Sequence, residues 1–105
     1  AVKEVLDHIS LHYQQNLTVS ELSGLSNYSE YYFMKLFRQY TGKTLVEYIN
    51  DFRIEKAKYL LTHSDAPVTE IAMQVGFNST SYFIKKFQQS NKVSPHKYRK
   101  SMRQI

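Results

Sequence analysis

The sequence predicts an all-α fold of seven helices, arranged as two helix-turn-helix subdomains joined by a long linker helix. Gly and Pro are scarce, at 3 and 2 of 105 residues, and strand-like alternation is rare. Apolar residues instead recur at helical spacing, first at Val2, Val5, Leu6, Ile9 and Tyr13. One supersecondary pattern also occurs twice. We expect helices over residues 2–15, 18–25, 29–41, 44–62, 67–75, 79–91 and 94–102.

Several of these helices begin at recognisable capping residues. Thr18 and Glu21 fit a capping box, in which each side chain bonds the backbone amide of the other residue. Thr44 and Glu47 repeat that pattern, and Ser94 precedes a proline, which is favoured at the first helical position.

The two copies of the repeated pattern differ in length by one residue. Residues 19–28 match 68–77, and 31–37 match 81–87, so the second copy holds one extra residue just after its corner. This repeat divides the chain into a first helix-turn-helix subdomain (1–43), the linker helix (44–62) and a second helix-turn-helix subdomain (63–105).

The corner of each copy uses the same kinds of residue. A small residue allows two helices to approach, a residue that tolerates a left-handed backbone makes the turn, a large ring plugs the corner, and a polar residue caps the next helix. In chain order these are Ser23, Asn27, Tyr28 and Ser29 in the first copy, and Ala72, Gly76, Phe77 and Asn78 in the second.

The helix after each corner has one apolar face and one mixed face. Phe33, Leu36 and Phe37 have the spacing of a buried face, as do Phe83 and Phe87, with Lys86 in the place of Leu36. The opposite faces hold Glu30, Tyr31, Met34, Lys35 and Arg38 in the first copy and Ser79, Thr80, Ser81, Ile84, Lys85 and Gln88 in the second. Such hydroxyl, amide and cationic groups can bond base edges and phosphates. The alternatives are solvated cations and hydroxyls that only cap the helix.

Positive charge is concentrated at one end of the chain. The formal net charge is +5, yet all nine acidic residues lie at or before Glu70, and seven basic residues follow it. This distribution favours a polyanionic partner, either nucleic acid or an anionic membrane. A linker of residues 44–62 would be roughly 25–30 Å long, which suits two recognition helices about one turn of DNA apart.

Other classes of function find little support. Cysteine is absent, so disulfides and thiolate metal sites are excluded, and a reducing cytoplasm fits. No apolar run is long enough for a membrane span, and no catalytic constellation, phosphate-binding loop or cofactor motif occurs. His8 and His12 are spaced for a metal, but no third ligand is evident, and we favour a packed or solvated pair. We therefore expect no enzyme, metal or cofactor.

Several ordered motifs resemble the DNA-binding domain of the AraC/XylS family of bacterial transcription regulators. They are Phe52-Arg-Ile-Glu-Lys-Ala-Lys-Tyr-Leu-Leu61, Val68-Thr-Glu-Ile-Ala-x-x-Val-Gly-Phe77, Ser81-Tyr-Phe-x-x-x-Phe87 and Ser94-Pro-x-x-Tyr-Arg99. The resemblance covers residues 2–100. It implies seven helices, double-stranded DNA as partner, and third and sixth helices that enter adjacent major-groove segments. It also implies a cytoplasmic transcription regulator, often an activator that contacts RNA polymerase, with a sensor or dimerisation domain in many members.

The resemblance also assigns individual positions. Base-reading positions fall on Tyr31, Met34, Lys35 and Arg38, and on Ser79, Thr80, Ser81, Ile84 and Lys85. Tyr32 and Tyr82 map near the DNA backbone, where we also expect the capping residues Ser29 and Asn78. Arg53 and Lys56 are interpreted as structural or phosphate-holding residues.

Three positions depart from the family pattern. Lys92 occupies the place of a helix-ending Gly, and we expect Asn91 to make the left-handed turn instead. Leu45 stands where the second copy has Pro95, and Met34 is apolar at a reading position. The competing hypothesis is an all-helical module whose exposed faces dock a protein. Met34 and Ile84 fit that hypothesis, whereas the hydroxyls and lysines do not.

Overall fold

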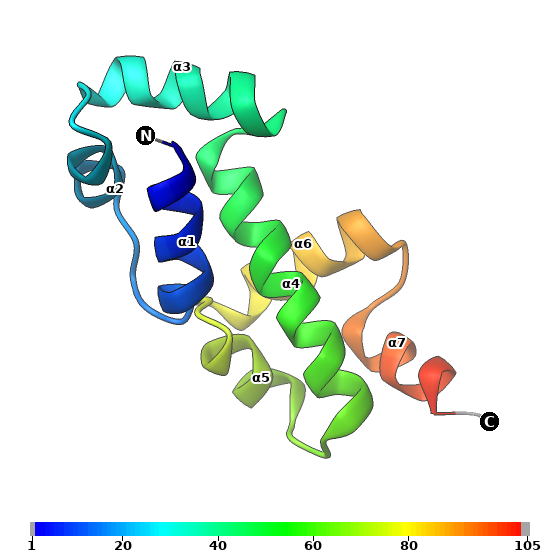
Figure 1. Cartoon of the computed structure of the whole chain (residues 1–105). Coiled ribbons are helices and arrows are strands. Elements are labelled where there is room, and N and C mark those ends of the chain that lie inside the picture. Colours follow the sequence, from blue (N-terminus) through cyan, green and yellow to red (C-terminus); the bar gives the residue numbers. More distant parts are fainter. Residues whose placement is uncertain (1, 104–105) are drawn as a thin grey trace. The chain divides into compact units, whose positions relative to one another are not determined.

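The computed structural model describes residues 2–103, and that range contains seven helices and no strand (Figure 1). They are α1 (Val2–His12), α2 (Val19–Ser26), α3 (Glu30–Thr41), α4 (Leu45–His63), α5 (Val68–Gln74), α6 (Thr80–Asn91) and α7 (Pro95–Met102). This confirms the predicted all-α class. The chain forms two compact units, residues 1–50 and 51–105, and α4 passes from the first into the second.

The first unit is built around the inward faces of its helices. α1 packs against both α2 and α3 (Figure 1). The buried core of this unit includes Val5, Ile9, Leu22, Phe33, Phe37, Leu45 and Ile49. The ring of Phe37 also meets the edge of Tyr48, from the first turns of α4, at 5.4 Å between centroids.

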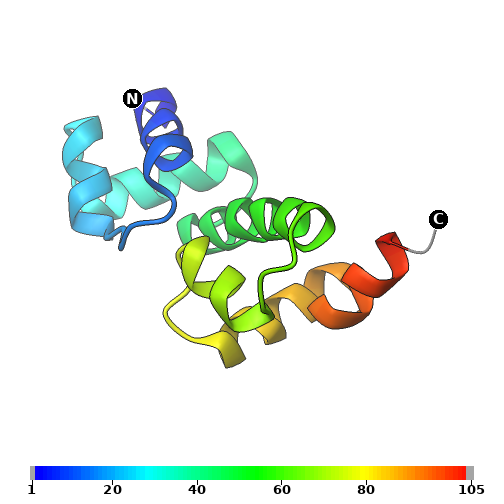
Figure 2. The ribbon, with the colours of Figure 1, turned by 90° about the horizontal axis from the view of Figure 1, so that it is seen from below.

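The second unit repeats this packing with α5, α6 and α7, together with the second half of α4 (Figure 2). Its core includes Ile54, Ala57, Leu61, Ile71, Ala72, Val75, Phe77, Phe83 and Phe87. Phe87 meets Tyr98 of α7 edge-on at 5.5 Å, which matches the Phe37–Tyr48 contact of the first unit.

Two arginines join α7 to the end of α4 and the loop that follows. Arg99 donates to the carbonyls of Leu61 (3.0 Å), Ser64 (3.2 Å) and Ala66 (2.6 Å). Arg103 donates to the carbonyls of Thr62 and Ser64 and to the carboxylate of Asp65. The carbonyls of Leu61 and Thr62 lie in the last turn of α4, which leaves them without intrahelical partners, and those of Ser64 and Ala66 lie in the loop that follows.

The predicted caps are largely confirmed. Thr18 accepts from the amide of Glu21, and Ser94 accepts from the amide of Lys97. Thr44 and Glu47 form the full reciprocal box, at 3.2 and 2.8 Å. The predicted bond from the backbone N–H of Thr18 to the Glu21 side chain is wrong, because the Glu21 carboxylate lies 4.0 Å from Nε2 of His8 instead. The first helix also ends at His12, three residues earlier than predicted.

Helices end at residues with a left-handed backbone where the sequence predicts turns, except that the residue after α6 differs from the prediction. Asn27 has φ +63° and Gly76 has φ +108°, as the corner residues require. Lys92, rather than Asn91, has φ +66°. Asn91 stays in the last turn of α6, where its amide bonds the carbonyl of Phe87 at 3.1 Å. The backbone N–H of Lys92 donates to the carbonyl of Gln88. In the same way, the backbone N–H of Gly42 donates to the carbonyl of Arg38 at the end of α3.

The strain at Lys92 predicts that Lys92→Gly stabilises the protein. Residues other than Gly are disfavoured at positive φ, so removing the Lys92 side chain should raise the free energy of unfolding by about 1 kcal/mol. Urea denaturation without DNA measures it. Lys43→Gly is the control, because Lys43 has no positive φ and Gly there should cost about 0.4–1 kcal/mol. Equal effects of the two substitutions would contradict the interpretation.

The Arg103–Asp65 ion pair predicts a small pH-dependent contribution to stability. Its Nη1–Oδ1 distance is 2.7 Å, and the bond from Arg103 lowers the pKa of Asp65 below its ordinary value. The contribution is therefore complete above the unfolded-state pKa and is lost as pH falls through the lower, folded-state pKa. Asp65→Asn should be less stable than wild type near pH 7, and the difference should shrink at about pH 2, because protonation of Asp65 removes the charge of the ion pair. Urea denaturation at both pH values checks this; a difference that persists undiminished in acid would assign the effect to something other than charge.

Candidate nucleic-acid interface

α3 and α6 present equivalent surfaces. Residues 31–48 and 81–98 fall, position by position, into the same classes of burial and exposure. Ser29 caps α3 by accepting from the amide of Tyr32, and Ser79 caps α6 by accepting from the amide of Tyr82. The two helices therefore begin in the same way and bury the same positions, although their exposed residues differ.

The extra residue of the second copy lies before the cap. Asn78, the cap predicted for α6, is exposed and lies one residue before the true cap, Ser79. The prediction was wrong because Ser29 corresponds to Ser79, so Asn78 is the inserted residue. The corner ring also differs between copies. Phe77 is 3% exposed, but Tyr28 is 44% exposed and packs edge-on against Tyr32.

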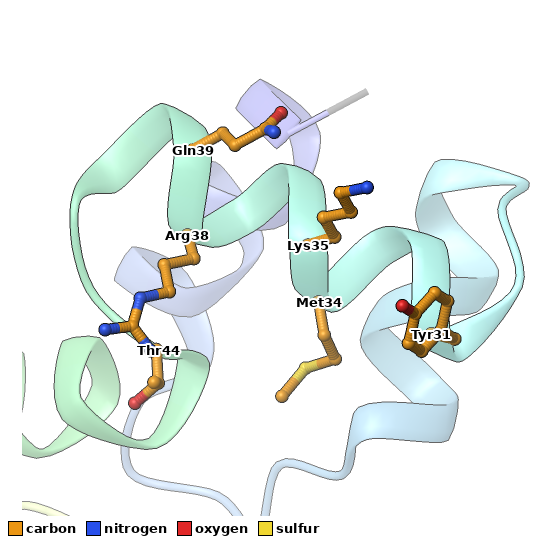
Figure 3. A pocket seen from close by; sticks show the side chains of 6 residues that line it. All are labelled: Tyr31, Met34, Lys35, Arg38, Gln39 and Thr44. Carbon is orange, nitrogen blue, oxygen red and sulfur yellow. The ribbon is translucent and has the colours of Figure 1, made fainter.

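The exposed face of α3 contains the predicted reading residues. Tyr31 is 81% exposed, Lys35 and Arg38 are exposed, and Met34 is half-buried. All four line a hollow on the surface of the first unit (Figure 3). In this view Tyr31, Met34 and Arg38 extend to one side of the helix, and Lys35 extends to the other.

Two residues that line the same hollow were missing from the predicted site. They are Gln39 and Thr44 (Figure 3). Gln39 lies one turn beyond Lys35, a spacing that the sequence shows. The hydroxyl of Thr44 accepts from Glu47, yet its proton remains able to bond a ligand.

The exposed face of α6 is richer in hydroxyls. Ser79 and Ser81 are exposed, as is Lys85, while Thr80 and Ile84 are half-buried. The Ser79 oxygen accepts from the Tyr82 amide, which leaves its proton for another acceptor. Capping and contact with a ligand are thus compatible at Ser79.

The aromatic residues divide between core and surface. Phe33, Phe37, Phe83 and Phe87 are fully buried, which confirms their predicted core role. Tyr32 and Tyr82 are 46% and 40% exposed, so their hydroxyl-bearing rings reach the surface. The ammonium of Lys86 lies 5.4 Å from the Tyr82 ring centroid, in agreement with a half-buried stem and an outward charge.

Arg53 has a structural contact inside the second unit. Its guanidinium lies 5.9 Å from the centroid of the buried Phe77 ring, and burial lowers the pKa of Arg53. Lys56 is exposed, with its ammonium 5.3 Å from the Phe52 ring centroid. These contacts favour the structural interpretation of Arg53, because its charge is already placed over the corner ring.

The histidines of α1 form a packed pair. The rings of His8 and His12 lie 4.4 Å apart, and Nε2 of His8 is buried. Within residues 2–103 no group of three or more His, Cys, Asp or Glu side chains is placed to hold a metal ion. None of the described helices is long and apolar enough to cross a membrane.

The two units carry very different charge. Residues 1–50 have four basic and five acidic side chains, whereas residues 51–105 have ten basic and four acidic ones. Formal charge is therefore about balanced in the first unit and strongly positive in the second. Long-range attraction to a polyanion would come mainly from the second unit.

Known proteins share this sequence and fold. The family model described as "Helix-turn-helix domain" matches residues 22–101. The chain is 40% identical to an uncharacterised HTH-type transcriptional regulator, YdeC of Bacillus subtilis, over 94% of this chain and 34% of that protein. It is 37% identical to the regulatory protein PocR of Salmonella typhimurium, over 96% of this chain and 33% of that protein. The chain thus spans about a third of the length of these relatives.

A solved structure extends the similarity to a complex with DNA. The DNA-binding domain of the global transcriptional factor AdpA, crystallised with a target DNA, superimposes with a TM-score of 0.92 at 29% identity. The match covers 96% of this chain and 91% of that one. Helix order, the repeated corner and these similarities agree: the chain belongs to the AraC-type family of helix-turn-helix DNA-binding domains, which serve transcriptional regulators and are not enzymes.

Proposed function

We propose that this domain binds double-stranded DNA sequence-specifically, with α3 and α6 in adjacent major-groove segments, and that it activates transcription in a bacterial cytoplasm. The observation that carries the proposal is the pair of equivalent helices, each anchored by buried phenylalanines and each exposing a polar and cationic face. A major groove admits one α-helix, and such faces match the groups that it displays.

The proposed reading residues are those whose side chains occupy the two exposed faces. They are Tyr31, Met34, Lys35 and Arg38 of α3, and Ser79, Thr80, Ser81, Ile84 and Lys85 around the start of α6. Lys35 and Lys85 correspond in the repeat, and either ammonium can donate to guanine O6 and N7. Ser29, Tyr32, Asn78 and Tyr82 are proposed to lie near phosphates, because they flank those faces.

The remaining parts of the proposal concern the longer protein. RNA polymerase is the proposed partner for activation, and a sensor or dimerisation domain is proposed in the full-length regulator. The division into residues 1–43, 44–62 and 63–105 is proposed as its functional organisation, with two reading subdomains and a linker. The cations of the second unit would supply most of the salt-dependent attraction to phosphates.

Binding sites selected from a random DNA pool test the sequence-specific part. We expect footprints over two neighbouring major-groove segments. Lys35→Ala and Lys85→Ala should each weaken binding to the selected site by about 1–3 kcal/mol, or roughly 5- to 150-fold, with less loss on random DNA. Lys3→Ala is the matched control, since Lys3 is an exposed cation on α1. Equal losses on selected and random DNA would reassign both lysines to phosphate contacts.

Transcription in vitro tests the proposed activation. With bacterial RNA polymerase, adding the full-length regulator should increase transcript from a promoter that carries the selected site upstream. A promoter with a scrambled site is the control and should not respond. Less transcript from the intact promoter would identify a repressor and leave sequence-specific binding standing.

A further inference from the structure

The first residue of α3 is a carboxylate with no bonding partner. Glu30 is exposed and directly follows the cap Ser29. Among residues 2–103 no hydrogen bond or ion pair involves its side chain. The positions one turn along are Phe33 and Met34, so the helix itself supplies no cation to neutralise it.

Glu30 also differs from the other acidic residues that begin helices in this chain. Glu21, Glu47 and Glu70 are each the third residue of their helix, the position from which a carboxylate can reach back to the cap. Glu30 is the first residue of its helix, where that bond is unavailable. Favourable interaction with the helix dipole remains, but the capping box does not account for this residue.

The corresponding residue of α6 is Thr80, one of the proposed DNA contacts. Both residues follow a serine cap with the same hydrogen bond, so the scaffold places positions 30 and 80 alike within their own helices. The chemistry differs, because an ionised carboxylate only accepts hydrogen bonds, whereas a hydroxyl also donates. A phosphate would repel Glu30, and so would the N7 and O6 acceptors of guanine.

In the major groove, a carboxylate best matches cytosine. Cytosine displays its N4 amino donor there without a neighbouring acceptor, whereas adenine displays an N7 acceptor beside its N6 amino donor. The other charged residues of the exposed α3 face, Lys35 and Arg38, are cations suited to guanine or phosphate. Since the first unit carries no net positive charge, it would depend on base contacts, in the proposed complex, more than the second unit does.

We propose that Glu30 is a specificity-determining residue, which selects cytosine at one position of the segment read by α3. This inference rests on the proposed function. By its charge, Glu30 also disfavours any register in which the start of α3 lies against phosphates. The first unit would thus rely mainly on base contacts, whereas the basic second unit would add strong attraction to the DNA backbone to its own base contacts.

The test compares wild type with Glu30→Gln and Glu30→Thr on the selected site and on every single-base-pair variant of it. Wild type should prefer cytosine at one position by about 5- to 150-fold. Glu30→Gln should shift that preference toward adenine, because an amide can both accept from N6 and donate to N7. Glu30→Thr, which copies α6, should remove most of the preference and raise affinity for random DNA.

Asp7→Asn is the charge-matched control, because Asp7 is an exposed acid on α1 of the same unit. It should leave every base preference unchanged. Circular dichroism melting of each variant establishes that the fold is intact. Unchanged preferences in both Glu30 variants, or a uniform rise in affinity for all DNA, would overturn the inference and leave the proposed function standing. Wild type without any sequence preference would instead overturn the proposed function.

Discussion

The exposed faces of α3 and α6 depend on the burial of two phenylalanines one turn apart in each helix. Phe33 and Phe37, and likewise Phe83 and Phe87, are fully buried. Truncating a buried phenylalanine typically costs about 3–5 kcal/mol, so a rotation that exposed either pair would be strongly disfavoured. The opposite face of each helix is therefore held toward solvent, and residues there are free to vary in chemistry without loss of the fold.

The helices that follow α3 and α6 complete this anchor. Tyr48 and Tyr98 meet the second phenylalanine of each pair edge-on, a favoured geometry for aromatic rings. The repeat therefore extends past the matching letters of the sequence into the first turns of α4 and α7. Thr44 and Ser94 cap those turns alike, although only Thr44 has a glutamate three residues later.

The two units share a scaffold and differ in what they present. The repeat pairs Glu30 with Thr80, Met34 with Ile84, and Glu47 with Lys97, and the chemistry of the side chain differs in each pair. The inserted Asn78 lengthens the second corner, and the buried Phe77 replaces the exposed Tyr28. Such differences are expected when two copies of one structural unit bind unlike segments, because the core constrains only the buried positions.

The sequence by itself determined the seven helices, most of their caps, the left-handed corners at Asn27 and Gly76, and the two exposed faces, but it misplaced the cap and the left-handed end of α6 by one residue each. These features arise within windows of about four to eight residues, through local hydrogen bonds and helical periodicity. Only the tertiary structure decided the contacts between distant residues. It buried Phe77 beneath Arg53 while Tyr28 stayed exposed, and it joined Arg99 to the carbonyls after α4. It likewise brought Thr44 beside α3, because no local pattern specifies which side chains meet once the chain has turned back on itself.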